Sequence, residues 1–131
     1  MTLSAEQTLA IHQLVAMHGH LVDDQELDRV DEVFTPDAVY DVESLGYGTL
    51  HGLDAFRAAG AADRDRVGHH VTNVIVTEDD EGQVRARSKG IGILRDGRAG
   101  SVVYDDLLRS TPDGWRIAYR TIRPTRTSEI P

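Results

Sequence analysis

Cysteine is absent from this 131-residue sequence, which excludes disulfide bonds and thiol chemistry. No apolar run approaches the length of a membrane span, and the N-terminus lacks the basic and then apolar pattern of a signal peptide. Basic clusters are also missing, and the net charge of −8 argues against a nucleic-acid partner. We therefore expect a soluble cytoplasmic protein that acts on neither nucleic acid nor membranes.

Cofactor motifs are missing too. No group of His, Asp and Glu residues has metal-ligand spacing, and there is no glycine-rich phosphate-binding loop. The sequence thus predicts no metal and no nucleotide cofactor. Hydrophobic residues at 40% and charged residues at 27% are ordinary globular values. This length predicts one domain, residues 1–131, with a single core, a small cavity and a loose tail over 124–131.

The N-terminal third reads as helical. Ser4 and Gln7 form a capping-box pattern that predicts a helix start. An apolar stripe at helical spacing follows: Leu9, Ile11, Leu14, Val15, Met17, Leu21 and Val22. The histidines of this helix are expected to be exposed or at its boundary: His12, His18 and His20. Asp23 and Asp24 close the helix, where its dipole does not favour a carboxylate. A second helix is predicted over 25–34.

The rest of the chain turns from helix to strand. Thr35-Pro36-Asp37 is expected to break the second helix and to start an extended stretch over 38–42. A loop or hairpin around Gly46 to Gly48 and a short helix over 54–62 follow. Four long strands are then separated by short turns: 66–77, 84–94, 99–108 and 115–122. Helices first and an antiparallel meander afterwards predict an α+β fold.

The strand over 66–77 carries two adjacent histidines. Side chains alternate faces along a strand, so His69 and His70 must point in opposite directions. Simple alternation places His70 on the same face as Thr72, Val74 and Val76. An imidazole titrates near neutral pH and can exchange a proton readily. The structural alternative is that the histidines only satisfy hydrogen bonds at a strand end.

One face of the strand over 84–94 is nearly free of side chains. Its even positions read Val84, Ala86, Ser88, Gly90, Gly92 and Leu94. Glycine within a strand marks a bend or the close approach of another group. We therefore expect this face either to curve the sheet or to bound a cavity, and a strongly bent sheet does both.

Three stretches resemble the SnoaL-like branch of the nuclear transport factor 2-like (NTF2-like) superfamily, which includes polyketide cyclases and scytalone dehydratase. They are Val22-Asp23-Asp24-Gln25-Glu26-Leu27-Asp28, His69-His70-Val71-Thr72-Asn73 and Asp113-Gly114-Trp115-Arg116-Ile117. The order of the elements is similar over essentially the whole chain. The resemblance implies a cone in which the N-terminal helices pack inside a strongly curved, mainly antiparallel sheet.

The dehydratase pattern implies a catalytic aspartate and histidine that face each other across the cone. Asp23 matches the aspartate and His70 the histidine, so that His69 points away. The sequence departs from this pattern at the helix tyrosine, which is Val22, and at the tyrosine of the first strand, which is Val42. Tyr40 shares the face of Val42. The pattern's second histidine has no counterpart on the following strand.

The cyclases imply an acid on a late strand, which Asp106 matches. It shares a face with Tyr104, and Arg120 on the last strand can point the same way. The alternatives are an exposed acid beside Asp105 and an arginine at the rim with a solvated head.

These residues support one functional prediction. We expect a cofactor-independent enzyme that dehydrates, isomerises or cyclises a hydrophobic oxygenated molecule, such as a polyketide. Asp23 and His70 are the predicted acid–base pair. The predicted substrate-binding residues are Tyr40, Val42, Tyr104, Asp106 and Arg120.

Three further expectations stand beside this prediction. One alternative is a non-catalytic ligand-binding or assembly module, in which Asp23 and His70 form a structural ion pair. Another is an epoxide hydrolase-like enzyme, which needs an Asp-Arg-Asp arrangement around a water. Exposed apolar residues such as Ile91 and Ile93 predict a homo-oligomer, dimer or trimer, that packs sheet against sheet.

Overall fold

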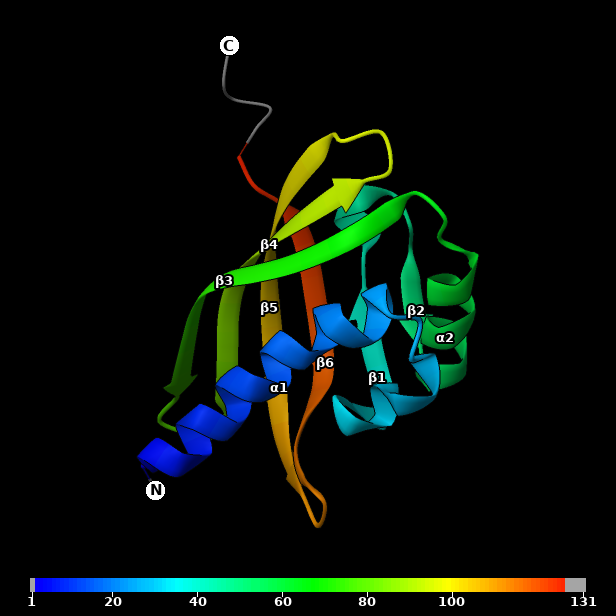
Figure 1. Cartoon of the computed structure of the whole chain (residues 1–131). Coiled ribbons are helices and arrows are strands. Elements are labelled where there is room, and N and C mark those ends of the chain that lie inside the picture. Colours follow the sequence, from blue (N-terminus) through cyan, green and yellow to red (C-terminus); the bar gives the residue numbers. More distant parts are fainter. Residues whose placement is uncertain (1, 127–131) are drawn as a thin grey trace.

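The structure is a computed structural model that describes residues 2–126, a curved six-stranded sheet with helices across one face (Figure 1). The strand order is β2-β1-β6-β5-β4-β3. The helical elements are α1 (Ala5–Asp23), the 3₁₀ turns η1 (Leu27–Glu32) and η2 (Glu43–Leu45), and α2 (Leu53–Ala62). The strands are β1 (Phe34–Asp41), β2 (Thr49–His51), β3 (Arg66–Glu78), β4 (Val84–Leu94), β5 (Ala99–Thr111) and β6 (Gly114–Pro124).

Helix α1 begins as its sequence predicts. The Ser4 hydroxyl accepts from the Gln7 N–H at 3.0 Å, and the Gln7 side chain accepts from the Ser4 N–H at 2.9 Å. The buried face of α1 consists of Ile11, Leu14, Val15, His18 and Leu21. The expectation that His18 is exposed or at the boundary is wrong, because it falls on the apolar stripe and is 5% exposed.

The second predicted helix is shorter than expected, and the strand after it begins earlier. Residues 25–34 form only the six-residue turn η1, and Phe34 already starts β1. Pro36 does not break the chain there, because the register of β1 against β6 shifts between Phe34 and Val39. A strand irregularity of this kind accommodates a proline that cannot donate a ladder hydrogen bond.

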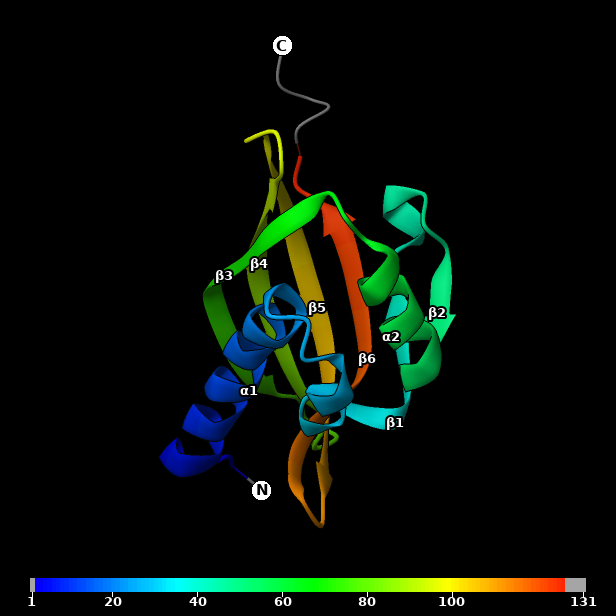
Figure 2. The same cartoon turned by 45° about the vertical axis from the view of Figure 1, so that its right-hand side comes forward.

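The four-stranded antiparallel meander β3–β6 is confirmed. Strand β1 pairs in parallel with β6 and antiparallel with β2, so the sheet is mixed and open. Figure 2 shows its curvature, with α1 and α2 on the same side of it. Pro124 ends β6, and the Thr125 N–H donates to Ser101. The predicted loose tail is therefore wrong at these two residues, whereas 127–131 lie outside the described residues.

Strand β3 contains a bulge that reverses its side-chain phase. Its register against β4 shifts between Thr72 and Ile75, and Asn73 adopts a left-handed conformation with φ of 56°. His69 and Val71 therefore face inward before the bulge, whereas Val74 faces inward after it. The prediction that one face carries His70, Thr72, Val74 and Val76 is wrong, because the first two side chains are exposed on the outer face.

The glycine-bearing face of β4 does face inward. Val84, Ala86, Ser88 and Gly90 are buried, and the alternate positions are exposed. The ring of Tyr104 lies so close to Gly90 that an added Cβ would collide with it. The missing side chain at Gly90 thus makes room for the Tyr104 ring. Within residues 2–126, no helix is long and apolar enough to cross a membrane.

Candidate active site

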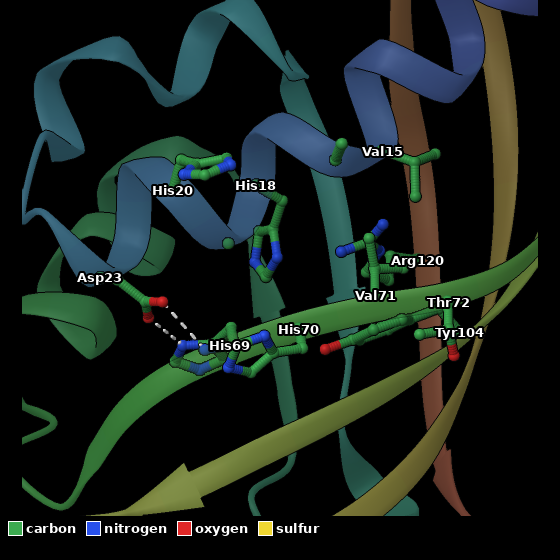
Figure 3. A pocket seen from close by; sticks show the side chains of 12 residues that line it. Val15, His18, His20, Asp23, His69, His70, Val71, Thr72, Tyr104 and Arg120 are labelled. Carbon is green, nitrogen blue, oxygen red and sulfur yellow. Dashed lines mark hydrogen bonds and ion pairs between the residues drawn. The ribbon is translucent and has the colours of Figure 1, made fainter.

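A cavity of about 350 Å³ lies between α1 and the inner side of the sheet (Figure 3). Helix α1 contributes one wall, strand β3 the facing wall, and β5 with β6 the inner end. The lining includes Val15, His18, Asp23, His69, Tyr104 and Arg120. The volume is within the range of small-ligand sites, and apolar surface with a few polar groups is the usual composition of such sites.

Asp23 and His69 form a hydrogen-bonded pair at the mouth of this cavity. Asp23 Oδ1 lies 2.6 Å from His69 Nδ1, and Asp23 Oδ2 accepts from the His69 backbone N–H at 2.9 Å. An ionised carboxylate only accepts hydrogen bonds, so Nδ1 carries the proton and Nε2 is left to act. No described residue hydrogen-bonds to Nε2. The pair therefore presents a single oriented proton-transfer atom.

Gly19 allows α1 to approach β3 closely enough for this pairing. A Cβ added at Gly19 would collide with the carbonyl oxygen of His69. Glycine within a helix costs roughly 0.5–1 kcal/mol relative to alanine. Its presence here is explained by the backbone contact, which holds Asp23 one turn further along α1 above the start of β3.

The predicted pairing of Asp23 with His70 is wrong. His70 borders the cavity, but its ring is exposed and lies beside Gly68 and Ile93 on the outer face of the sheet. The phase error comes from the bulge at Asn73. Val74 does face the core, as predicted, but counting back from it in steps of two crosses the bulge and selects His70 in place of His69.

His18 is a second imidazole on the cavity wall, which the sequence reasoning missed. Its ring contacts five others with centroid separations of 5.9–6.2 Å: Phe34, Tyr40, Phe56, His69 and Tyr104. Burial, then the charge of Arg120 and then His69, lower the pKa of His18 well below its ordinary value. The ring is therefore neutral near pH 7. Its place on the apolar stripe of α1 was the signal that could have identified it.

Arg120 and Asp106 form a bidentate ion pair beneath the cavity, as the sequence allowed. Arg120 Nε and Nη2 donate to Asp106 at 2.7 and 2.8 Å, and both side chains are almost completely buried. Burial opposes the charge of Arg120, but the paired carboxylate outweighs it and raises its pKa. The remaining nitrogen, Nη1, is buried with no partner among the described residues. It is a buried donor whose nearest polar neighbours include the Tyr40 hydroxyl.

Two tyrosines complete the polar inner end. The guanidinium of Arg120 lies 4.3 Å from the ring centroid of Tyr104, which lines the cavity. Burial raises the pKa of both Tyr104 and Tyr40, so both hydroxyls stay protonated and can donate hydrogen bonds. Of the predicted substrate-binding residues, Tyr104 and Arg120 line the cavity. Tyr40, Val42 and Asp106 lie behind its described lining.

No set of three or more His, Cys, Asp or Glu side chains in residues 2–126 is arranged to hold a metal ion. The epoxide hydrolase alternative requires a second aspartate on the arginine. Asp106 accepts hydrogen bonds from two nitrogens of Arg120, and no other described carboxylate accepts one from the third. The site is therefore an Asp–His pair, a neutral histidine and a partly satisfied arginine around an apolar cavity.

Comparison with known proteins identifies related sequences and folds. The SnoaL-like domain family matches residues 4–121. Comparison with curated proteins gives no match. A protein with a cystatin-like fold from Nostoc punctiforme is 22% identical with a TM-score of 0.81, and 97% of each chain is covered.

Two further solved structures have the same fold. An NTF2-like protein from Novosphingobium aromaticivorans is 23% identical with a TM-score of 0.81, covering 95% of this chain and 85% of the other. A hexachlorocyclohexane dehydrochlorinase (LinA) is 18% identical with a TM-score of 0.74, covering 90% and 84%. At these identities the likeness shows the fold and not the activity.

Proposed function

The chain belongs to the SnoaL-like domain family, and we propose that it is a cofactor-independent enzyme that moves a proton on a hydrophobic oxygenated molecule. The observation that carries the proposal is the Asp23–His69 pair, whose free Nε2 stands at the wall of the cavity. The dehydrochlorinase of the same fold supports it, because its name describes an elimination. Dehydration, isomerisation and aldol-type cyclisation all begin with such a proton transfer.

In the proposed reaction His69 is the general base. Its Nε2 takes a proton from a carbon next to a substrate carbonyl, and the C–H electron pair becomes the enolate double bond. Asp23 holds the Nδ1–H tautomer and stabilises the imidazolium that forms. Arg120 and the Tyr104 hydroxyl stabilise the charge that develops on the oxygen. The proton then returns to another carbon, or to a departing hydroxyl that leaves as water.

The polar groups favour an uncharged substrate. Asp106 already neutralises Arg120, and His18 is neutral, so the inner end of the cavity carries no net charge from these groups. A free carboxylate or phosphate would find no unpaired cation there. A ketone or phenol would find hydrogen-bond donors in an apolar enclosure. Polyketide-like ring systems have this chemistry.

Deuterium exchange into 2-tetralone in D₂O, followed by NMR, tests the proposal without knowledge of the natural substrate. We expect the wild type to catalyse exchange at the carbons beside the carbonyl, and His69→Gln to lower the rate by roughly 10²–10⁴-fold. Asp23→Asn should cost a comparable factor. The double variant should be no worse than His69→Gln, because both changes disable one unit.

A rival function is a ligand-binding module in which the pair only ties α1 to β3. The bond from the His69 backbone N–H to Asp23 favours this alternative, because it serves no proton transfer. In that case the wild type and His69→Gln would exchange 2-tetralone at the same rate. Losses that multiply in the double variant would also contradict the proposed unit.

A further inference from the structure

His18 has the features of a binding group rather than of a core residue. It is 95% buried, within a cage of aromatic rings, yet no described residue hydrogen-bonds to its ring. The ring nitrogens are not among the described side-chain atoms that are fully buried without a partner, so they face the open space of the cavity. A neutral imidazole there offers one donor and one acceptor to a molecule in the cavity. The imidazole is therefore best explained by a partner that enters the cavity.

The position of His18 relative to His69 defines what that partner is. The two ring centroids are 6.0 Å apart and the rings are nearly perpendicular, at 80°. At this separation the two rings are in edge-to-face contact, so a substrate does not pass between them but meets both from the cavity that they line. An oxygen about 2.8 Å from a nitrogen of His18 and a carbon about 3 Å from His69 Nε2 can then belong to one short substrate fragment.

We propose that His18 is a substrate-binding residue that hydrogen-bonds the oxygen next to the carbon from which His69 takes the proton. This inference rests on the proposed function and adds the substrate class, a carbonyl or enol whose oxygen is one bond away from the acidic carbon. His18 on α1 and Arg120 on β6 both line the cavity and then face that oxygen from two sides (Figure 3). As the ring is neutral, one nitrogen donates and the other accepts.

The other groups facing His18 are consistent with this role. Burial, Arg120 and His69 disfavour its protonation, so the ring stays neutral near pH 7 and does not compete with His69 for the substrate proton. Tyr40 on β1 and Tyr104 on β5 are protonated phenols and add no charge. A neutral donor facing the oxygen and a base facing the carbon are separate roles, so the two histidines do not exchange functions.

Binding of two matched probes tests the inference independently of turnover. 2-Naphthol and naphthalene share a ring system, but only the first carries an oxygen. At neutral pH we expect His18→Leu to weaken 2-naphthol binding by roughly three- to tenfold, the size of one net hydrogen bond, and to leave naphthalene binding equal or tighter. His18→Gln should restore part of the difference, because the amide still donates and accepts.

His12→Leu is the matched control, since it removes a histidine from the same helix outside the cavity lining. It should leave both affinities unchanged. An equal change for both probes in His18→Leu would show a purely structural role and overturn the inference, as would the failure of both probes to bind the wild type. Exchange in His69→Gln tests the proposed function, whereas the preference of the protein for 2-naphthol over naphthalene tests the role of His18. Either claim can therefore fail without the other.

Discussion

The rings of His18 on α1 and His69 on β3 meet edge to face beside one cavity, with their centroids 6.0 Å apart, but their surroundings differ. His69 has a carboxylate partner that fixes its tautomer. His18 is enclosed by rings and faces the charge of Arg120. One sequence thus supplies two imidazoles with different tasks, one suited to carrying a positive charge and one to staying neutral.

The lowered pKa of His18 predicts a pH-dependent stability. The folded state binds this proton less readily than the unfolded state, whose value is near 6.5, so stability is complete above that pH and is lost as the pH falls below it. The loss has a limiting slope of about 1.4 kcal/mol per pH unit from this group. Urea unfolding of the wild type and of His18→Leu across acidic pH checks it. Parallel profiles for the two proteins would contradict the assignment.

At the level of single residues, the sequence predicted which residue types form the site better than it predicted which way their side chains point. Asp23 and Asp106 were identified through the resemblance to the SnoaL-like branch, and regular strand alternation added Tyr104 and Arg120. The resemblance selected His70, and strand alternation did not correct that choice because one left-handed residue, Asn73, inserts a bulge. Asparagine tolerates that conformation better than most residues, but its presence in a strand does not by itself predict a bulge.

Among the elements, the contact between α1 and β3 determines whether the pair can form. Asp23 extends from the last turn of α1, and His69 lies near the start of β3, with Gly19 at the crossing point. The helix packs so closely on the strand there that not even a methyl group fits at residue 19. The geometry of the candidate active site is therefore a property of how one helix packs on one strand.

Gly19→Ala tests this packing. The new methyl group has to displace the His69 carbonyl, so we expect a loss of roughly 1–3 kcal/mol in the free energy of unfolding, despite the better helix propensity of alanine. Gly60→Ala in α2 is a matched control, because its methyl group meets only the Leu27 side chain, at 3.2 Å. Equal urea midpoints for the two variants would show that the crossing is not tight.

The elements themselves differed in how readily the sequence reveals them. The turns at Asp96-Gly97 and Pro112-Asp113-Gly114 are local signals, and the meander they connect was predicted correctly. The parallel pairing of β1 with β6 was not, because it joins segments about 80 residues apart and depends on tertiary packing. The same pairing draws Phe34 into β1, so the predicted helix over 25–34 is replaced by the turn η1, which ends at Glu32.

For the molecule as a whole, the buried pair of Asp106 and Arg120 links the central strands β5 and β6 beneath the cavity. Asp106→Asn leaves the buried guanidinium without a counter-charge, and we expect a loss of roughly 3–5 kcal/mol in the free energy of unfolding. Asp105→Asn is the neighbouring control. Its partner Arg123 lies 3.4 Å away with both side chains about 40% exposed, and such pairs contribute below about 1 kcal/mol. Similar losses in urea unfolding would contradict the prediction.

The outer face of the sheet carries exposed apolar residues on three strands. Ile75 is 62% exposed, Ile91 38% and Tyr119 39%. The homo-oligomer expected from the sequence, a dimer or trimer that packs sheet against sheet, stays a prediction. Sedimentation of the wild type beside Ile75→Lys measures it, and a smaller species for the variant is the expected result.

The central claim is that His69, and not its neighbour His70, is the proton-transfer residue. The exchange rate of 2-tetralone in His69→Gln and in His70→Gln compares two adjacent substitutions of identical chemistry on opposite faces of β3. We expect the first to lose roughly 10²–10⁴-fold in rate and the second to stay within about twofold of the wild type. A loss confined to His70→Gln would contradict the account and place the active histidine on the outer face.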